Sequence, residues 1–161
     1  MRKLKTKPSF AVLANNIRSL YNVGSIFRTA EAFGVSKLYL TGYTGNPENL
    51  IHRSKISKVA LGAENFLSWE YHKSAQKVIR LLKKEKYKIV ALENNIPKAY
   101  NLFKFKPKFP LLLVLGEEVG GINKNLLKQC EVVLEIPMLG KKDSLNVSVA
   151  FGVAISHITP F

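Results

Sequence analysis

Two short aliphatic runs near the C-terminus, each followed by a polar turn, constrain the fold of this chain most strongly. The first run, LLLVL at residues 111–115, leads directly into the turn GEEVGG. The second covers residues 132–136 and ends at Pro137, which cannot donate a hydrogen bond to a neighbouring strand. In an open α/β sheet, ligands bind beyond the carboxyl ends of the strands. This segment therefore predicts a ligand pocket whose rim includes backbone N–H and C=O groups.

Strands and helices alternate along the rest of the sequence. Apolar runs predict strands at residues 9–14, 37–41 and 87–92. Helical patterns predict one helix from an N-cap at Asn22 to Gly34 and another over residues 74–86. The last helix is expected to begin after an N-cap at Ser144, and its apolar residues on all sides predict contact with the sheet and with a partner subunit. The pattern predicts an α/β fold with a mainly parallel sheet flanked by helices.

Length and composition limit what such a chain can be. With 161 residues and 47% hydrophobic content, the expectation is a single globular domain over residues 1–161, with a basic N-terminal tail at residues 1–8. No segment approaches the roughly 20 apolar residues of a membrane-spanning helix, so no membrane contact is expected. The lone Cys130 fits a reducing, cytoplasmic location. The scattered histidines predict no metal site.

A formal net charge of +14 favours a polyanionic partner, most commonly nucleic acid. The alternative is a generally basic proteome in which lysine only improves solubility. Residues 42–66 are expected to form a long loop with a short helix near residues 54–60. Its basic residues His52, Arg53 and Lys55 are candidates for RNA contact, although an ordinary solvated loop would contain them too.

Residues 101–110, NLFKFKPKFP, alternate phenylalanine with lysine. That alternation can stack bases and bind phosphates. It is also typical of a connector whose phenylalanines pack inward while its lysines stay in solvent. Both interpretations remain open from the sequence.

Three sequence blocks carry a family resemblance: NVGSIFRTAEAFGV, LGEEVGGI and IPMLGKKDSLNVSVAFG. In order and spacing they resemble the three motifs of the SpoU (TrmH-like) family of the SPOUT superfamily, and the similarity covers essentially the whole chain. Members of that family are S-adenosyl-L-methionine (AdoMet)-dependent RNA ribose 2′-O-methyltransferases. The resemblance implies AdoMet as cofactor, RNA as substrate, a C-terminal trefoil knot and a homodimer.

The resemblance also assigns roles to individual residues. Those expected at the methyl-transfer site match all three motifs and are Asn22, Arg28, Glu118, Ser144 and Asn146. Those expected to contact AdoMet are Leu115, Gly116, Ile136, Met138, Ser144 and Leu145. Arg28 is also expected to contact the RNA. Because no appended RNA-binding domain is recognised, substrate choice is expected to rest on the chain's own loops and tail.

The permanent positive charge of a guanidinium limits the catalytic roles that Arg28 can have. A ribose hydroxyl must lose its proton, or its developing negative charge must be stabilised, close to the methyl donor. The family proposal makes the arginine a general base, but a guanidinium is effectively always protonated. A fixed cation that stabilises the alkoxide and grips a phosphate is the more conservative role. For Asn22, Ser144 and Asn146, simple helix capping is the alternative to a catalytic role.

Two rival functions remain open from the sequence. One is a non-catalytic RNA-binding protein of the same fold, and the other is a SPOUT enzyme that methylates a base. The catalytic-type residues of the three motifs argue against the first, and the arginine of NVGSIFRTA argues for ribose over base. A tRNA wobble position, the tRNA D-loop and a 23S rRNA site all remain open as the target, with tRNA weakly favoured.

Overall fold

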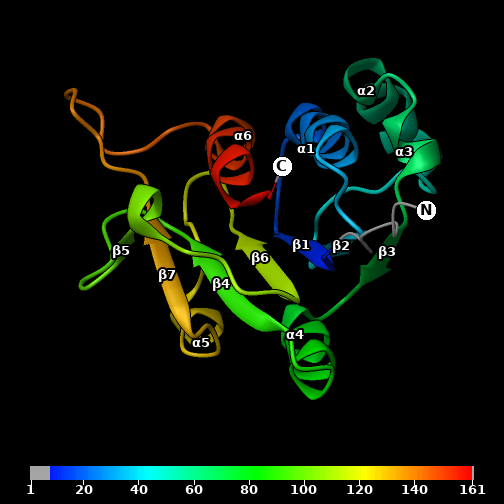
Figure 1. Ribbon diagram of the computed structural model, residues 1–161. Coiled ribbons are helices and arrows are strands. Elements are labelled where there is room, and N and C mark those ends of the chain that lie inside the picture. The colour runs from blue at the N-terminus through cyan, green and yellow to red at the C-terminus, as the bar shows by residue number, and fades with distance from the viewer. Residues whose placement is uncertain (1–7, 161) are drawn as a thin grey trace, which may run out of the picture.

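The computed structural model describes residues 8–160, and those residues form a seven-stranded sheet with helices on both faces (Figure 1). Most of the predicted basic tail, residues 1–7, lies outside the described residues. The strands are β1 (Phe10–Asn15), β2 (Lys37–Thr41), β3 (Trp69–His72), β4 (Lys88–Leu92), β5 (Tyr100–Asn101), β6 (Leu111–Leu115) and β7 (Val132–Glu135). The helices are α1 (Leu20–Ala32), α2 (Leu50–Ala60), α3 (Ala63–Phe66), α4 (Ala75–Lys84), α5 (Lys124–Leu127) and α6 (Val147–Ile158), with a 3-10 turn at Leu102–Lys104.

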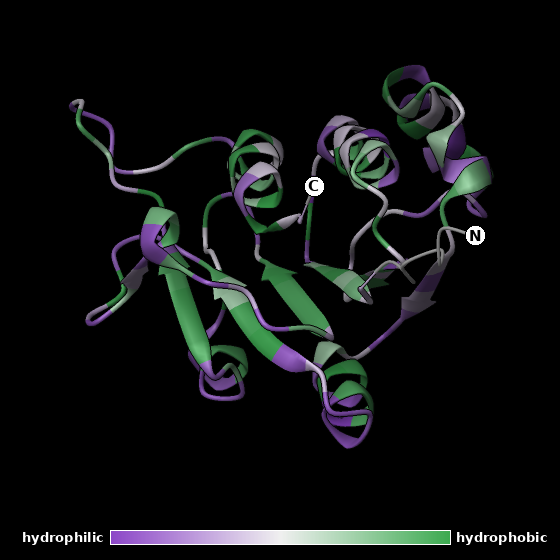
Figure 2. Cartoon of the chain, in the orientation of Figure 1, coloured by the Kyte–Doolittle hydropathy of each residue, from purple (hydrophilic) through white to green (hydrophobic). Residues whose placement is uncertain are grey.

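Every strand pairing in the sheet is parallel, in the order β3-β2-β1-β6-β4-β7-β5. The central strands β1 and β6 pair from Phe10 opposite Leu111 to Ala14 opposite Leu115, and all of these residues are buried. Strands buried on both faces explain the unbroken aliphatic runs in the sequence, coloured green in Figure 2. The prediction of an α/β fold with a mainly parallel, helix-flanked sheet is confirmed.

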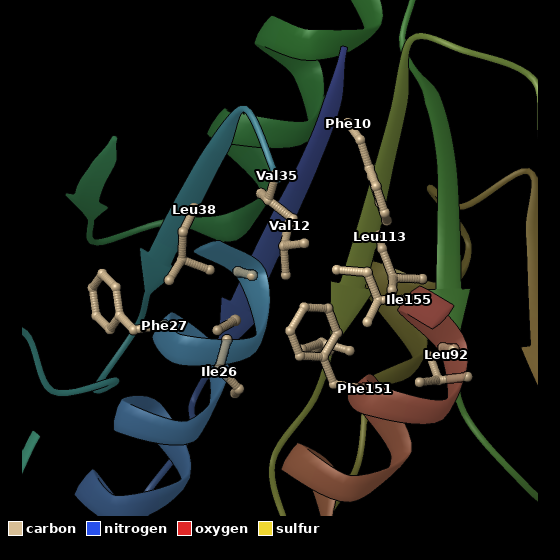
Figure 3. Packing of buried hydrophobic residues seen from close by; sticks show 14 of the residues in the cluster. Phe10, Val12, Ile26, Phe27, Val35, Leu38, Leu92, Leu113, Phe151 and Ile155 are labelled. Atoms are coloured by element: carbon tan, nitrogen blue, oxygen red, sulfur yellow. The ribbon is translucent and has the colours of Figure 1, made fainter. Parts of the chain in front are cut away.

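The helices divide the core into two layers, one on each face of the sheet. On one face, α1 and α6 lie side by side, with α2 and α3 beyond α1, whereas α4 and α5 cover the other face (Figure 1). Val23, Ile26 and Phe27 of α1 are fully buried at helical spacing. Figure 3 shows Ile26 of α1 and Phe151 and Ile155 of α6 among the side chains that fill the space above the strands.

Two predicted helix caps are wrong. Helix α1 begins at Leu20, and its N-cap is Ser19, whose hydroxyl accepts a hydrogen bond from the Asn22 N–H. Asn22 therefore lies in the first turn, and its side chain is free for other contacts. Likewise the N-cap of α6 is Asn146, not Ser144, because the Asn146 carboxamide oxygen accepts hydrogen bonds from the N–H groups of residues 148 and 149. Helix α6 buries Phe151, Ala154, Ile155 and Ile158 within the chain, whereas Val149 is 52% exposed.

The long loop predicted for residues 42–66 is wrong for the most part, because α2 and α3 occupy much of it, although the short helix expected near residues 54–60 falls within α2. Helix α2 buries only Ile56 and Ala60, so its sequence lacks the apolar periodicity by which a helix is recognised. Its position depends on Gly24 of α1. A Cβ atom at Gly24 would lie 2.5 Å from the backbone oxygen of Ile56, so glycine allows the two helices to approach this closely.

The structure favours the connector interpretation of residues 101–110. Phe105 and Phe109 pack against the core, and Lys104, Lys106 and Lys108 are exposed. Phe103 departs from the pattern because it is 55% exposed. No helix within residues 8–160 is long and apolar enough to cross a membrane.

Candidate functional site

A cavity of about 210 Å³ lies where strands β4 and β6 end. These strands are neighbours in the sheet, so the segments that follow them meet at the same edge. The C-terminal segment before and within α6 closes the cavity from the third side. The lining residues include Leu92, Glu93 and Asn94 after β4, Leu115, Gly116 and Glu118 after β6, and Ser144, Leu145, Val147 and Ala150 from the C-terminal segment.

Backbone packing in the turn after β6 requires glycine at two positions. A Cβ atom on Gly116 would lie 2.6 Å from the backbone of Gly121, and Gly121 itself has a φ of +63°. Glu117 and Gly121 form a small antiparallel bridge that closes the turn. From β4, the Glu93 carboxylate accepts a 2.7 Å hydrogen bond from the Ile122 N–H. The turn is therefore folded back tightly and fixed to the neighbouring strand end.

Asn94 attaches the C-terminal segment to the end of β4. Its carboxamide accepts a 3.0 Å hydrogen bond from the Ile136 N–H and donates a 2.9 Å hydrogen bond to the Ile136 oxygen. The same amide nitrogen also lies 3.3 Å from the backbone oxygen of Asp143, to which it donates. One side chain thus holds both ends of the loop between residues 136 and 143.

A second network, centred on Glu118, joins three distant parts of the chain. Its carboxylate accepts 3.0 Å hydrogen bonds from the backbone N–H groups of Arg18 and Ser19 and from the side-chain amide of Asn22. Burial by itself would raise the pKa of the Glu118 carboxyl, but these hydrogen bonds outweigh it, so the pKa lies below its ordinary value. The Asn22 oxygen in turn accepts a 3.1 Å hydrogen bond from the Asn146 amide.

Ser148 completes this network. Its hydroxyl donates to the Asn146 oxygen at 2.7 Å and lies 3.4 Å from the Asn22 oxygen. The expected catalytic residues Asn22, Glu118 and Asn146 are thus brought together in one hydrogen-bonded group. Ser144 lies nearby, where it lines the cavity and its hydroxyl donates to the Asp143 carboxylate at 3.3 Å.

Arg28 lies apart from this group. Asn22 is six residues earlier in α1, which places the two residues about 9 Å apart along the helix axis and on different sides of it. The Arg28 side chain is exposed, does not line the cavity, and forms no hydrogen bond or ion pair with any residue in the described range 8–160. Within one chain, the structure does not bring Arg28 to the cavity.

The residues expected to contact a cofactor divide into two sets. Leu115, Gly116, Ser144 and Leu145 line the cavity. Ile136 and Met138 do not line it: Ile136 is buried and bonded to Asn94, and Met138 packs against the core. Ile136 and Met138 therefore hold the start of the loop between residues 136 and 143 in place and do not form part of the cavity wall.

Of the expected RNA-contacting residues, Arg28 lies on α1, whereas His52, Arg53 and Lys55 lie together on α2 but face different ways. Arg53 and Lys55 are exposed. The His52 ring is turned inward, and its Nδ1 atom is buried without a hydrogen-bond partner among residues 8–160. Of the three on α2, only Arg53 and Lys55 are therefore placed to meet a large polyanion. Among residues 8–160 there is no group of three or more histidine, cysteine or acidic side chains that could hold a metal ion.

Sequence reasoning missed Glu93, Asn94 and Ser148. Glu93 and Asn94 directly follow a predicted strand, which places them at a ligand-binding edge, but their partners lie 29 and 42 residues further along the chain. Ser148 is part of the third sequence block, where its position in the first turn of the last helix is the only available signal.

The parallel sheet, with a cavity at its carboxyl edge, defines an α/β protein with a ligand site at the ends of neighbouring strands. Residues 9–156 match the SpoU rRNA Methylase family, and the chain belongs to that family. An uncharacterized tRNA/rRNA methyltransferase of Archaeoglobus fulgidus is 30% identical over 164 residues, covering 95% of this chain and 65% of the relative. The 23S rRNA (guanosine-2′-O-)-methyltransferase RlmB of Nitrosomonas europaea is 27% identical over 150 residues, covering 93% of this chain and 55% of the relative. The chain spans between about half and two thirds of the length of these curated relatives.

Solved structures show the same fold. The TrmH/SpoU tRNA modifying enzyme of A. aeolicus aligns with a TM-score of 0.82 and 25% identity, covering 95% of this chain and 75% of that one. The SpoU methyltransferase AviRb of Streptomyces viridochromogenes, solved with the cofactor AdoMet, aligns with a TM-score of 0.83 and 23% identity, covering 94% of this chain and 57% of that one.

Replacing Asn94 with alanine should loosen the loop between residues 136 and 143. The variant loses the hydrogen bonds to Ile136 and Asp143, at a cost of about 1–3 kcal/mol. The loop contains the exposed Lys141 and Lys142, so limited digestion with trypsin followed by mass spectrometry should show faster cleavage there. Asn125→Ala, an exposed site on α5, is the matched control and should leave the cleavage rate unchanged. Equal rates in both variants would contradict the role of Asn94.

Replacing Glu118 with glutamine should give a pH-dependent loss of stability. Because the folded pKa is depressed, the contribution of Glu118 is fully present above the unfolded carboxyl pKa and is lost as pH falls through the folded value. Urea unfolding at about pH 7 should therefore show a loss of about 1–3 kcal/mol, and the difference from the unmodified protein should shrink by about pH 3.

The control for that measurement is Glu117→Gln. Glu117 pairs with Arg18 at 2.8 Å, but the Arg18 side chain is 69% exposed, so the change should cost no more than about 1 kcal/mol. A Glu118→Gln deficit that stays constant from neutral to acidic pH would show that the ionised carboxylate is not what stabilises the network.

Proposed function

We propose that this protein is an AdoMet-dependent RNA methyltransferase that transfers a methyl group to a ribose 2′-hydroxyl of tRNA or rRNA. Membership of the SpoU rRNA Methylase family supports the proposal, as do relatives named as guanosine-2′-O-methyltransferases. The observation that carries it is the hydrogen-bonded group Glu118–Asn22–Asn146 beside the cavity lined by Gly116 and Leu145. A net charge of +14 suits an RNA substrate.

The residues around the cavity fit AdoMet by their chemistry. Gly116 allows the turn after β6 to fold back against Gly121 and Ile122, where a Cβ atom would clash, so that the turn forms one wall of the cavity. Leu115, Leu145 and Ala150 offer an apolar surface for a flat purine, while Glu93 and Ser144 offer polar groups for hydroxyl and amino groups. At about 210 Å³ the cavity is smaller than the roughly 300–1,000 Å³ of most ligand sites. We therefore infer that the loop between residues 136 and 143 moves outward on binding.

In the proposed reaction AdoMet supplies the methyl group, and the chain must meet three requirements of the ribose hydroxyl. The ribose hydroxyl must be held against the cofactor, its developing negative charge must be stabilised, and its proton must pass to solvent. Asn22 and Asn146 lock each other's orientation and so present fixed polar groups at the cavity rim. Arg28 serves as a fixed cation for the alkoxide and the neighbouring phosphate, since a neutral guanidinium would be exceptional.

The exposed position of Arg28 supports assembly as a homodimer. Arg28 shares the outward face of α1 with Tyr21, which is 49% exposed, and Val149 is exposed on the adjacent α6. Gly152 of α6 has open space where its Cβ would be, although glycine costs a helix interior about 1 kcal/mol. Close approach of a partner helix would explain this glycine. In the proposed dimer, the partner's Arg28 completes the cavity of this chain.

The trefoil knot is also a proposal for this chain. Its support is the attachment of the loop between residues 136 and 143 to the end of β4 through Asn94, together with the SPOUT resemblance. A single domain and a cytoplasmic location remain predictions. The rival of a non-catalytic RNA-binding protein predicts RNA binding without methyl transfer, and the rival of a base methyltransferase predicts a methylated base in the digested product.

Arg28→Ala should lose methyl transfer while it keeps cofactor binding. With labelled AdoMet and bulk tRNA and rRNA, nuclease digestion and mass spectrometry should show a 2′-O-methyl product for the unmodified protein, reduced about 10²-fold or more in the variant. AdoMet affinity by calorimetry should change little, because the proposed partners of Arg28 are the ribose alkoxide and a neighbouring phosphate and not the cofactor. Arg80→Ala removes the same charge from an exposed position on α4 and is the control. Full activity of Arg28→Ala would overturn the role proposed for it.

Mixed dimers test whether Arg28 acts across subunits. Leu145→Trp places a large ring in the cavity and should abolish AdoMet binding. When Arg28→Ala and Leu145→Trp chains are co-expressed, half of the dimers carry one intact composite site, and activity should return to about a quarter of normal. Each variant expressed alone should stay inactive. No recovery in verified mixed dimers would show that Arg28 acts within its own chain or not at all.

A further inference from the structure

A second cavity, of about 450 Å³, lies among α2, α3 and β3 and shares no lining residue with the first. Its walls include Arg53 and Ser57 of α2, Glu64 and Asn65 of α3, and Trp69 of β3. Its volume falls within the range typical of small-ligand sites, about 300–1,000 Å³. In Figure 1 these elements lie at the end of the helical layer away from α6.

Glu64 is the unusual residue of this cavity. It is only 8% exposed, and its Oε2 atom is buried without a hydrogen-bond partner among residues 8–160. Burying a carboxylate without partners is costly, so proteins almost always provide donors for one. Here no described residue does so for Oε2, and Glu64 is one of the residues that line the cavity. The missing donors are therefore expected from a ligand.

Arg53 lines the same cavity and forms no ion pair with Glu64. Its Nε group donates a 2.8 Å hydrogen bond to the Pro47 oxygen, which fixes the guanidinium in place. The two charged groups form no ion pair within 4.0 Å, so the terminal guanidinium N–H groups remain available to a ligand. The Trp69 ring N–H donates to the Glu64 backbone oxygen at 3.2 Å and so ties β3 to α3 beside the cavity.

These groups define the ligand chemically. It must present donors to the carboxylate and acceptors to the guanidinium, and it must be flat enough to lie beside an indole ring. Guanine meets each condition: N1–H and N2–H₂ form a pair of donors on one edge, and O6 and N7 form a pair of acceptors that arginine binds in a bidentate manner. Adenine, cytosine and uracil lack the paired donors. A cationic peptide side chain would satisfy Glu64 but would be repelled by Arg53.

We propose that the cavity lined by Glu64, Arg53 and Trp69 binds an unstacked guanine of the RNA substrate, away from the nucleotide that is methylated. This inference rests on the proposed function for the identity of its ligand as RNA. Lys55 and Lys58 are exposed on the same helix as Arg53, where phosphates next to the guanine can meet them. The cavity therefore contributes to substrate choice.

Trp69 gives a direct readout because it is the only tryptophan in the chain. Its fluorescence is titrated with the single-stranded RNA UUGUU and with UUAUU, UUCUU and UUUUU. UUGUU should quench it and bind roughly tenfold more tightly than the others, the discrimination expected of a bidentate contact. Replacing the guanine by inosine removes the N2 amino group facing Glu64, and 7-deazaguanine removes the N7 acceptor facing Arg53. Each analogue should weaken binding by several-fold.

Variants assign the preference to the two charged residues. Glu64→Gln keeps the shape but loses the second acceptor, so it should no longer distinguish guanine from inosine, while its discrimination against 7-deazaguanine through Arg53 remains. Arg53→Ala should lose the discrimination against 7-deazaguanine. Glu85→Gln, at the C-cap of α4, and Arg80→Ala, within α4, make the same charge changes on exposed positions and should bind as the unmodified protein does.

Several outcomes would overturn the proposal. Equal binding of all four RNAs by the unmodified protein would show that the cavity does not read a base. Quenching by a lysine-rich peptide but not by RNA would assign the cavity to a protein partner. Methyl transfer without guanine-dependent quenching would refute this inference and leave the proposed function standing. Guanine-dependent quenching by a protein that does not bind AdoMet would support this inference and overturn the proposed function.

Discussion

The arrangement of the site depends on one interaction, the hydrogen bonding of the Glu118 carboxylate to the N-terminal end of α1. Glu118 follows β6, and it accepts from two backbone N–H groups and from Asn22, about 100 residues earlier in the chain. A carboxylate is favoured there because the N-terminal end of a helix carries partial positive charge, and the two N–H groups directly precede the first helical residue, Leu20. Because Asn22 then holds Asn146, the same contact sets the position at which α6 begins.

The cavity therefore has one rigid wall and one adjustable side. The rigid wall consists of the ends of β4 and β6, where Gly116 permits backbone packing that no side chain would allow. The adjustable side lies toward the loop between residues 136 and 143, which contributes only Asp143 to the lining, is attached through Asn94 and bears a fully exposed Leu139. A loop fixed at its ends but not along its length can open without disturbing the sheet. That property suits a cavity smaller than the cofactor proposed to fill it.

The sequence was informative where single residues report their own environment. Buried parallel strands read as aliphatic runs, which is why β2 and β6 were predicted with the bounds they have. It failed where two residues compete for one role, as when Ser19 rather than Asn22 caps α1. It failed again for Asn94, whose partners lie 42 residues and more along the chain. Such contacts follow from strand order, which no local pattern encodes.

The two wrong caps change how the proposed catalysis is understood. Because Ser19 satisfies the helix end, the Asn22 side chain bonds to Glu118 and Asn146 instead of to its own backbone. Asn146 does cap α6 through its oxygen, yet its amide remains free to reach Asn22. Capping and catalysis are thus not exclusive alternatives for Asn146. The helix end fixes the side chain, and a side chain fixed in this way can orient a ribose hydroxyl without first losing conformational entropy.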